Sequence, residues 1–173
     1  MKKIIGVIIL SLFITFNLSA QQKYSVSAKI GTGVSVSTPS ATPFTLEALG
    51  HYNLTQHWAF GAGMGYGLYD KVSLIPLYGN IKYTINPRSK YILFADCSAG
   101  YGFALGSNNN GGFYLNPEFG VQRKLWDKTF SLAAGYGVQN LKRLKSNSNE
   151  YFISQFVESV GFHCVSLKLG VMF

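Results

Sequence analysis

The segment that decides the fold is Trp58–Tyr69, with the sequence WAFGAGMGYGLY. Every second residue from Trp58 onward is apolar, whereas Gly61, Gly63, Gly65 and Gly67 occupy the positions between. Successive side chains of a β-strand point to opposite faces. The segment is therefore predicted to be a strand with one large apolar face and one nearly bare face. Large side chains of neighbouring strands are expected to fill the space over the glycines.

Seven further segments show the same alternation, at about 24–36, 43–53, 73–85, 91–105, 112–124, 129–140 and 161–173. Gly-Tyr-Gly recurs at 65–67, 100–102 and 135–137, so its tyrosines are 35 residues apart. A repeat of one hairpin with a glycine-aromatic signature is typical of antiparallel barrels. The glycine triplets lack the spacing of a nucleotide-binding loop. We predict an all-β, eight-stranded, antiparallel up-and-down barrel.

Charged and amide side chains concentrate on the glycine-bearing face of these strands. They are Lys29, Glu47, His51, Asn80, Lys82, Asp96, Asn116, Glu118, Gln122, Gln139 and Lys168. A soluble lipocalin-type barrel would show the reverse arrangement, with its apolar face inside. An apolar outer face suits lipid, and a closed barrel leaves no unpaired strand edge in a bilayer. The pattern therefore predicts a transmembrane barrel with a polar interior.

The interior polar residues have two interpretations. An eight-stranded lumen is about wide enough for its own side chains, which favours a packed structural network over a channel. We expect the acidic residues Glu47, Asp96 and Glu118 to pair with Lys29, Lys82 and Lys168, because buried charges need partners. His51 belongs to the same interior set.

The first twenty residues are predicted to be a cleaved export signal. Lys2 and Lys3 precede an apolar run from Ile4 to Leu18, and Ala20 stands before Gln21 as a cleavage site requires. An uncleaved anchor is the alternative, and no cysteine follows to carry a lipid. The barrel domain is then residues 21–173. The 173 residues carry 15 basic and 7 acidic side chains, a net charge of +8 that falls to +6 without Lys2 and Lys3. In an exported chain this excess points to anionic lipids or lipopolysaccharide rather than nucleic acid.

The connections between segments alternate in length. Tight turns at 53–57, 86–90 and 126–128 are expected on the periplasmic side, and loops at 37–43, 107–112 and 141–160 on the outside, with a short connection at 70–72 as the exception. Aromatic residues should form a girdle near the turns, although a carbohydrate-binding platform is the alternative. They are Tyr24, Tyr52, Trp58, Tyr83, Tyr91, Trp126 and Phe173. Cys97 and Cys164 fall on opposite faces of non-neighbouring strands, so we expect two free thiols.

The last segment alternates apolar residues from His163 and ends in Phe173. With this ending, residues 21–173 resemble the small outer-membrane β-barrel domain family of Gram-negative bacteria, broadly OmpX- and OmpA-like. The resemblance implies that Phe173, Val171 and Leu169 are read by the barrel-assembly machinery, which inserts the chain into the outer membrane. It implies no single activity, since members are adhesins, assembly subunits, lipid enzymes or structural proteins.

The 141–160 loop is the strongest candidate for an interaction site. Lys142, Arg143 and Lys145 form a basic cluster suited to lipopolysaccharide phosphates. Apolar residues from Ile153 to Val160 recur at helical spacing, which predicts a short helix that packs on the rim or on another protein. The alternative is a solvated loop with an extension of the last two strands. We expect a structural or interaction role through the outer loops, with another outer-membrane protein as candidate partner.

The alternative function is a lipid A- or phospholipid-modifying enzyme. Lipid A deacylase barrels use a His and a Ser on one membrane-facing strand face, but Ser166 lies three residues after His163 and thus on the other face. His51 has no nucleophile nearby, and His57 falls in a turn. A metal site would need three or four converging ligands. We therefore expect no catalytic, cofactor or metal site.

Overall fold

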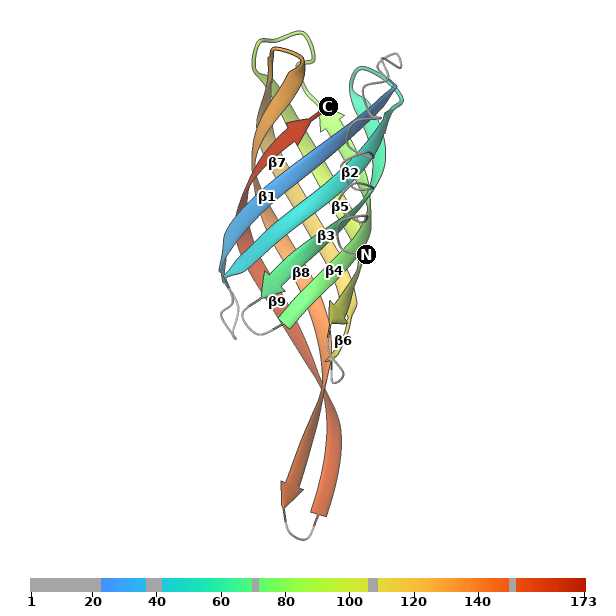
Figure 1. Cartoon of the computed structure of the whole chain (residues 1–173), viewed down its shortest axis with the longest axis vertical. Helices are drawn as coiled ribbons and strands as arrows, with labels where there is room; N and C mark the ends of the chain where they lie inside the picture. Colours follow the sequence, from blue (N-terminus) through green and yellow to red (C-terminus); the bar gives the residue numbers. More distant parts are fainter. Residues whose placement is uncertain (1–22, 37–41, 70–71, 106–108, 150–151) are drawn as a thin grey trace, which may run out of the picture.

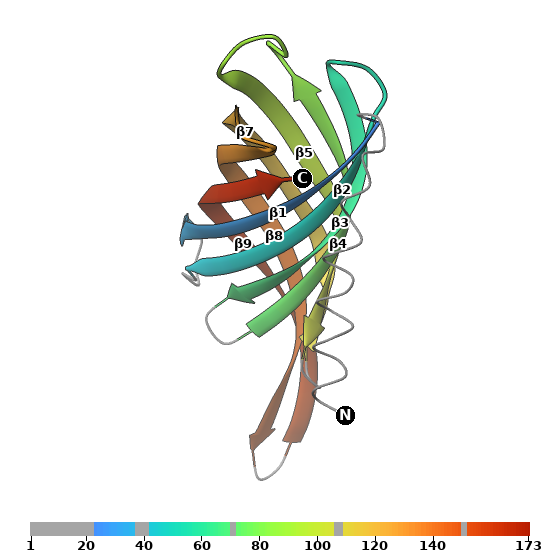
Figure 2. The ribbon, with the colours of Figure 1, turned by 45° about the horizontal axis from the view of Figure 1, so that its top comes forward.

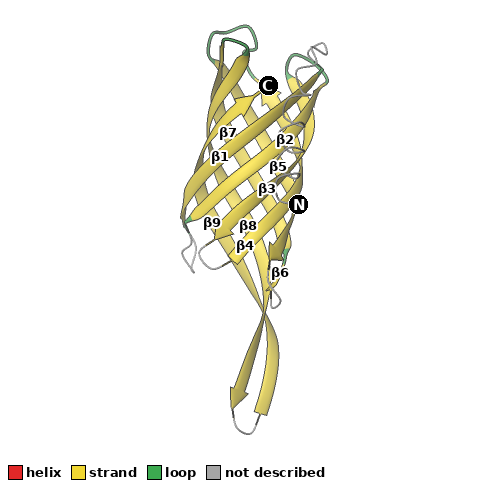
Figure 3. Cartoon of the chain, viewed as in Figure 1, coloured by secondary structure: helices red, strands yellow, loops and turns green. Residues whose placement is uncertain are grey.

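The barrel is described by a computed structural model that covers residues 23–36, 42–69, 72–105, 109–149 and 152–173, with the backbone alone at 109, 142–149 and 152–160. Its strands are β1 (Tyr24–Ser35), β2 (Pro43–Asn53), β3 (Trp58–Tyr69), β4 (Val72–Thr84), β5 (Ile92–Leu105), β6 (Asn109–Asn110), β7 (Gly112–Leu125), β8 (Lys128–Asn149) and β9 (Phe152–Met172) (Figure 1). Every element among the described residues is a strand (Figure 3). Those residues include no helix that is long and apolar enough to cross a membrane.

The eight long strands form one closed antiparallel wall. Consecutive long strands pair with one another, and β9 pairs with both β8 and β1. At the closing seam Ala28 lies opposite Val171, and Val34 lies opposite Val165. The wall curves round on itself with tilted strands (Figure 2). This closure confirms the predicted up-and-down barrel and leaves no free edge in its wall.

Burial alternates along the strands of the barrel wall, wherever the structure describes side chains, as the sequence pattern predicts. Ile30, Met64 and Leu167 are about half exposed on the outside, whereas the intervening polar residues are buried. The glycines of β3 lie beneath large interior side chains of β2 and β4. A Cβ added at Gly63 would lie 2.8 Å from Tyr78 Cε2, and one at Gly61 would lie 2.9 Å from the His51 ring. The bare face of β3 therefore makes room for its neighbours, which confirms the interpretation of this segment.

The two ends of the barrel differ. At the turn end, defined by the β2–β3, β4–β5 and β7–β8 connections, the strands join through short turns and the chain ends at Phe173 (Figure 1). At the opposite loop end, β8 and β9 continue far beyond the other strands as a two-stranded hairpin. Their pairing runs from Thr129 opposite Met172 to Asn149 opposite Phe152.

The hairpin settles an alternative that the sequence leaves open. Residues 141–149 and 152–160 extend the last two strands, and the helical interpretation of the apolar spacing from Ile153 to Val160 is wrong. The reason is that each strand has a partner along its whole length, so cross-strand hydrogen bonds replace helical ones. A second difference concerns 107–112, predicted as a loop, where β6 pairs Asn109 with Arg143 and Asn110 with Lys142.

Cys97 is exposed on the outer face and Cys164 is buried inside, and both are free thiols as predicted. The predicted export signal, with its cleavage site between Ala20 and Gln21, lies outside the described residues.

Candidate functional site

The centre of the barrel interior holds an ion-pair network with Glu118 at its middle. Lys29 Nζ donates to Glu118 Oε2 at 2.7 Å and to Asp96 Oδ2 at 3.0 Å. Lys168 Nζ donates to Glu118 Oε1 at 2.6 Å and to Glu47 Oε1 at 2.5 Å. The five side chains come from five strands, β1, β2, β5, β7 and β9, and all are buried. The structure thus brings together five of the six charged interior residues predicted from the sequence, and their ion pairs connect the wall across the lumen.

Neutral side chains fill the space around this lumen network. Asn116 Nδ2 donates to Glu118 Oε1 at 2.7 Å and to Tyr114 Oη at 3.3 Å, and the Tyr114 hydroxyl donates to Glu47 at 3.4 Å. The rings of Tyr114 and Tyr78 lie 5.3 Å apart. Two cavities beside Glu47 and Tyr114 measure only ≈ 10 Å³ each. Such a volume is at the lower limit for a single water molecule, so the middle of the lumen is filled.

An apolar plug closes the lumen at the loop end. It consists of Tyr69, Leu74, Leu141 and Phe162, which come from β3, β4, β8 and β9. Leu74 is 0% exposed, and the rings of Tyr69 and Phe162 lie 5.5 Å apart. The plug was not anticipated from the sequence. A signal was present, because Leu74, Leu141 and Phe162 are large apolar residues on the interior face near the ends of their segments.

The turn end of the lumen is open instead. A mouth cavity of ≈ 700 Å³ reaches inward to His51, Lys82 and Gln122. His51 Nε2 lies 2.9 Å from Asn80 Oδ1, and Asn80 in turn donates to Ser98 Oγ at 2.9 Å. The interior is thus a blind pocket that opens at the turn end and is closed by the lumen network and the plug.

The predicted pairing of Lys82 with a carboxylate is wrong. Lys82 Nζ donates to Gln122 Oε1 at 2.7 Å and lies 4.6 Å from the centre of the Phe94 ring. Asp96 lies directly opposite Lys82 in the strand register, but it bonds to Lys29. Among the described residues, Lys82 forms no ion pair. The lumen network therefore contains two lysines and three carboxylates, with the third lysine one step nearer the mouth.

The remaining histidines lie in a turn and on the outer face. His57 lies in the β2–β3 turn, where Nδ1 donates to the Thr84 carbonyl at 2.8 Å. On the outer face, His163 Nδ1 lies 3.1 Å from Tyr136 Oη, whereas Ser166 is buried in the interior. In the described part of the chain, no group of three or more His, Cys, Asp or Glu residues is placed to hold a metal ion.

The carboxy-terminal residues implicated in assembly face outward. Leu169 and Phe173 are more than half exposed, and Phe173 exchanges backbone hydrogen bonds with Val26 at 2.8 and 3.4 Å. The position of Val171 opposite Ala28 places it on the same seam. Their recognition by the assembly machinery stays a prediction.

The basic residues of the hairpin occupy successive register positions. Lys142 is opposite Ser159, Arg143 is opposite Glu158 and Lys145 is opposite Phe156. The contact of Lys142, Arg143 and Lys145 with lipopolysaccharide stays a prediction.

No protein-family model matches the sequence, and no curated protein matches it either. Several solved structures share its architecture. Neisserial surface protein A is 17% identical with a TM-score of 0.58, and OprG from Pseudomonas aeruginosa is 10% identical with a TM-score of 0.64; each match covers 87% of this chain and 96% of the other. AlkL is 11% identical with a TM-score of 0.60, covering 91% of this chain and 92% of its own. This chain has the fold of the small outer-membrane β-barrels. At these identities the likeness concerns the fold alone.

Proposed function

We propose that this chain is a non-conducting integral outer-membrane barrel that serves a structural or protein-interaction role, with the β8–β9 hairpin as its contact element. The observation that carries the proposal is the hairpin itself. The other long strands contain between 11 and 14 residues, whereas β8 contains 22 and β9 contains 21. From Leu141 to Asn149 the extension spans about 26 Å at about 3.3 Å per residue.

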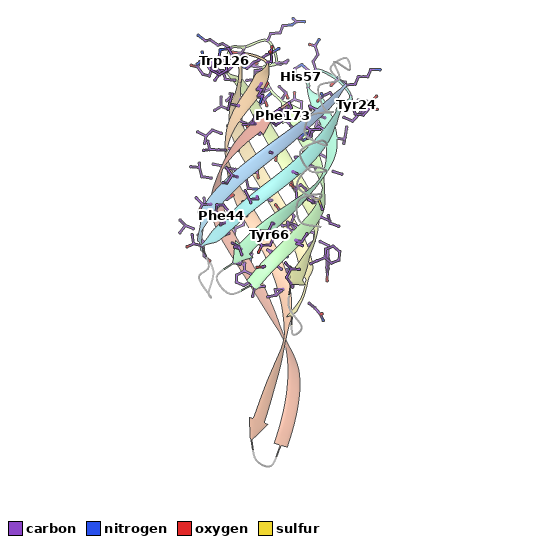
Figure 4. All side chains as sticks on the ribbon, viewed as in Figure 1. Tyr24, Phe44, His57, Tyr66, Trp126 and Phe173 are labelled. Atoms are coloured by element: carbon purple, nitrogen blue, oxygen red, sulfur yellow. The ribbon has the colours of Figure 1, made fainter. Side chains whose placement is uncertain are left out.

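The outer surface of the barrel supports its place in a membrane. Large apolar side chains project around the wall, and aromatic residues occur towards both ends (Figure 4). Trp126 and Tyr24 lie at the turn end, while Phe44 and Tyr66 lie nearer the loop end. Charged side chains in the middle of the wall point inward instead. This is the distribution that a bilayer requires of a barrel.

The backbone of the hairpin offers a recognisable mode of binding. A two-stranded ribbon has two outer edges with unpaired N–H and C=O groups, and an extended segment of another protein can add to such an edge. In the part of the chain that the structure describes, β6 pairs with this extension only at Lys142 and Arg143. Residues 144–149 therefore present an edge to which a partner strand can pair. Interaction with another outer-membrane protein is the use that this geometry supports best.

A pull-down from native outer membranes tests the contact element. The tagged wild-type chain is compared with a variant in which residues 144–157 are replaced by Asn-Gly, a two-residue turn that closes the pair of Arg143 and Glu158. A matched control is Lys142→Gln/Arg143→Gln/Lys145→Gln, which keeps the hairpin length. We expect one stoichiometric partner with the wild type and the control and its loss with the shortened variant. Equal recovery by all three, or no partner with any, would overturn this role.

The filled lumen predicts that the purified protein does not conduct ions. The lumen network and the plug occupy the path, and the cavities beside Glu47 hold ≈ 10 Å³ each. In a planar bilayer we expect no stable unitary current steps. Reproducible, ion-selective steps of constant size would contradict the blind interior.

A further inference from the structure

The β7–β8 turn combines an unusual backbone with an unusual exposure. Leu125 pairs with Lys128, which leaves Trp126 and Asp127 as a two-residue turn. Trp126 has φ 56°, and it is the one positive-φ residue other than glycine among those described. Two-residue hairpins favour Asn or Gly at such positions. Its side chain is 92% exposed, so the turn holds a large apolar ring outside the folded core at a conformational cost.

Three cations flank Trp126 in the sequence. Arg123, Lys124 and Lys128 lie within two or three residues of Trp126, and Asp127 is the nearby acid in the chain. The ion pairs of the described residues include none of these three cations. Arg123 and Lys128 instead contact aromatic residues. Arg123 donates to Tyr91 Oη at 3.2 Å, and Lys128 Nζ lies 4.6 Å from the centre of the Phe173 ring.

The same end of the barrel carries the other exposed cations of the turns. Lys23, Arg88 and Lys90 are all exposed there, and so are the aromatic residues Tyr24, Trp58 and Tyr83 at the ends of β1, β3 and β4. Tryptophan and tyrosine prefer the boundary between lipid and water, and cations at that boundary attract anionic headgroups. Cation, aromatic ring and strained turn therefore coincide where the barrel meets a bilayer surface.

We propose that the β7–β8 turn anchors the barrel to anionic phospholipid headgroups, with Lys124 and Lys128 as the contacting cations and Trp126 inserted at the interface. This inference rests on the proposed function, because it needs the barrel to span a bilayer. A soluble anion would need a cavity to hold it, but the mouth cavity is lined by residues outside the β7–β8 turn. Trp126 instead projects from the tip of the turn, where a lipid surface can meet it.

Tryptophan quenching tests the anchor directly. The protein has two tryptophans, Trp58 and Trp126, so Trp58→Phe leaves Trp126 as the sole reporter. This variant is folded into vesicles of equimolar phosphatidylcholine and phosphatidylglycerol, with bromine on the acyl chains of one lipid or of the other. We expect quenching to show that phosphatidylglycerol is enriched about fivefold over phosphatidylcholine around Trp126. This is the enrichment that roughly one contact between a lysine and an anionic headgroup would produce.

Two variants that each lose two positive charges show which turn causes the preference for the anionic lipid. In the Trp58→Phe background, Lys124→Gln/Lys128→Gln should reduce the preference to about one, whereas Arg88→Gln/Lys90→Gln, in the β4–β5 turn, should leave it unchanged. Arg123 is kept in both because it donates a hydrogen bond to the Tyr91 hydroxyl as well as packing on the ring.

The outcomes separate this inference from the proposed function. The anchor would be overturned if the two brominated lipids quenched Trp126 equally in the unmodified turn. It would also be overturned if both charge variants reduced the lipid preference by the same amount. In either case the barrel would still lie in the membrane. Absence of quenching by either lipid would show that Trp126 meets no bilayer. If vesicle-bound protein also migrated identically with and without boiling, the membrane barrel itself would be contradicted.

Discussion

Replacing Glu118 with glutamine is expected to destabilise the folded barrel by about 3 kcal/mol, because removing one partner of a buried ion pair leaves uncompensated charge. Glu118 holds Lys29 at 2.7 Å and Lys168 at 2.6 Å, and its carboxylate is almost fully buried. Glutamine keeps the size of the side chain but not its charge. The loss of stability should therefore arise because the two buried lysines, Lys29 and Lys168, have one carboxylate fewer to neutralise them.

Urea-induced unfolding in lipid vesicles measures this loss, with the protein concentration and lipid composition held constant. The control is Asp127→Asn, which removes an acidic residue that is exposed in the β7–β8 turn. It should change the free energy of unfolding by less than about 0.5 kcal/mol. A loss below about 1 kcal/mol for Glu118→Gln would mean that the lumen network is hydrated and contributes little.

Two glycine-to-alanine substitutions on adjacent strands should have opposite outcomes. At Gly100 an added Cβ would lie 2.6 Å from Tyr78 Cα and 2.8 Å from Tyr78 Cβ, and these atoms cannot move without shifting β4. At Gly79 the nearest atom within reach is the Gly61 carbonyl oxygen at 4.0 Å. We expect Gly100→Ala to cost about 3 kcal/mol through overpacking. Gly79→Ala should be neutral or stabilising, since it reduces the freedom of the unfolded chain.

Gly100→Ala and Gly79→Ala are compared by the fraction of folded, heat-modifiable protein on gels. Urea unfolding of the folded fraction then gives the free energy of unfolding. Gly79 and Gly100 belong to paired strands, so both variants change the same region of the wall. Equal tolerance of alanine at the two positions would show that the interior face of β5 is not packed as described.

The strands and their faces could be predicted because alternation is a local property of the sequence. In β1 the change from Val26 to Ser27 to Ala28 is enough to assign each side chain to the outside or the inside. The glycines of β3 could be assigned for the same reason. A closed barrel then follows from the number of such segments and from the need to leave no edge in lipid.

Partner choice inside the lumen could not be predicted in the same way. The register places Asp96 opposite Lys82, yet Asp96 pairs with Lys29 from a strand on another part of the wall. Such contacts depend on the diameter of the barrel and on the reach of long side chains across it. The apolar plug was missed for a related reason, because Tyr69 and Leu74 of the β3–β4 pair meet Phe162 of β9 only after closure.

The hairpin illustrates the limit of short periodic patterns. Over eight residues, apolar spacing of three and four is compatible with a helix and with a strand whose side chains face both ways. The partner strand decides between them, as the pairing of Leu144 with Val157 shows. Its role depends on surfaces that no local pattern defines.

The central claim is that the outer face of this barrel meets lipid while its charges lie inside. Cys97 tests it, because its thiol is free and exposed on the middle of β5. A nitroxide is attached to Cys97 in the unfolded Cys164→Ser variant, which is then folded into vesicles, and the accessibility of the label is measured with oxygen and with a water-soluble nickel complex. The account predicts high accessibility to oxygen and low accessibility to nickel. Higher accessibility to nickel than to oxygen would place this face in water and contradict the account.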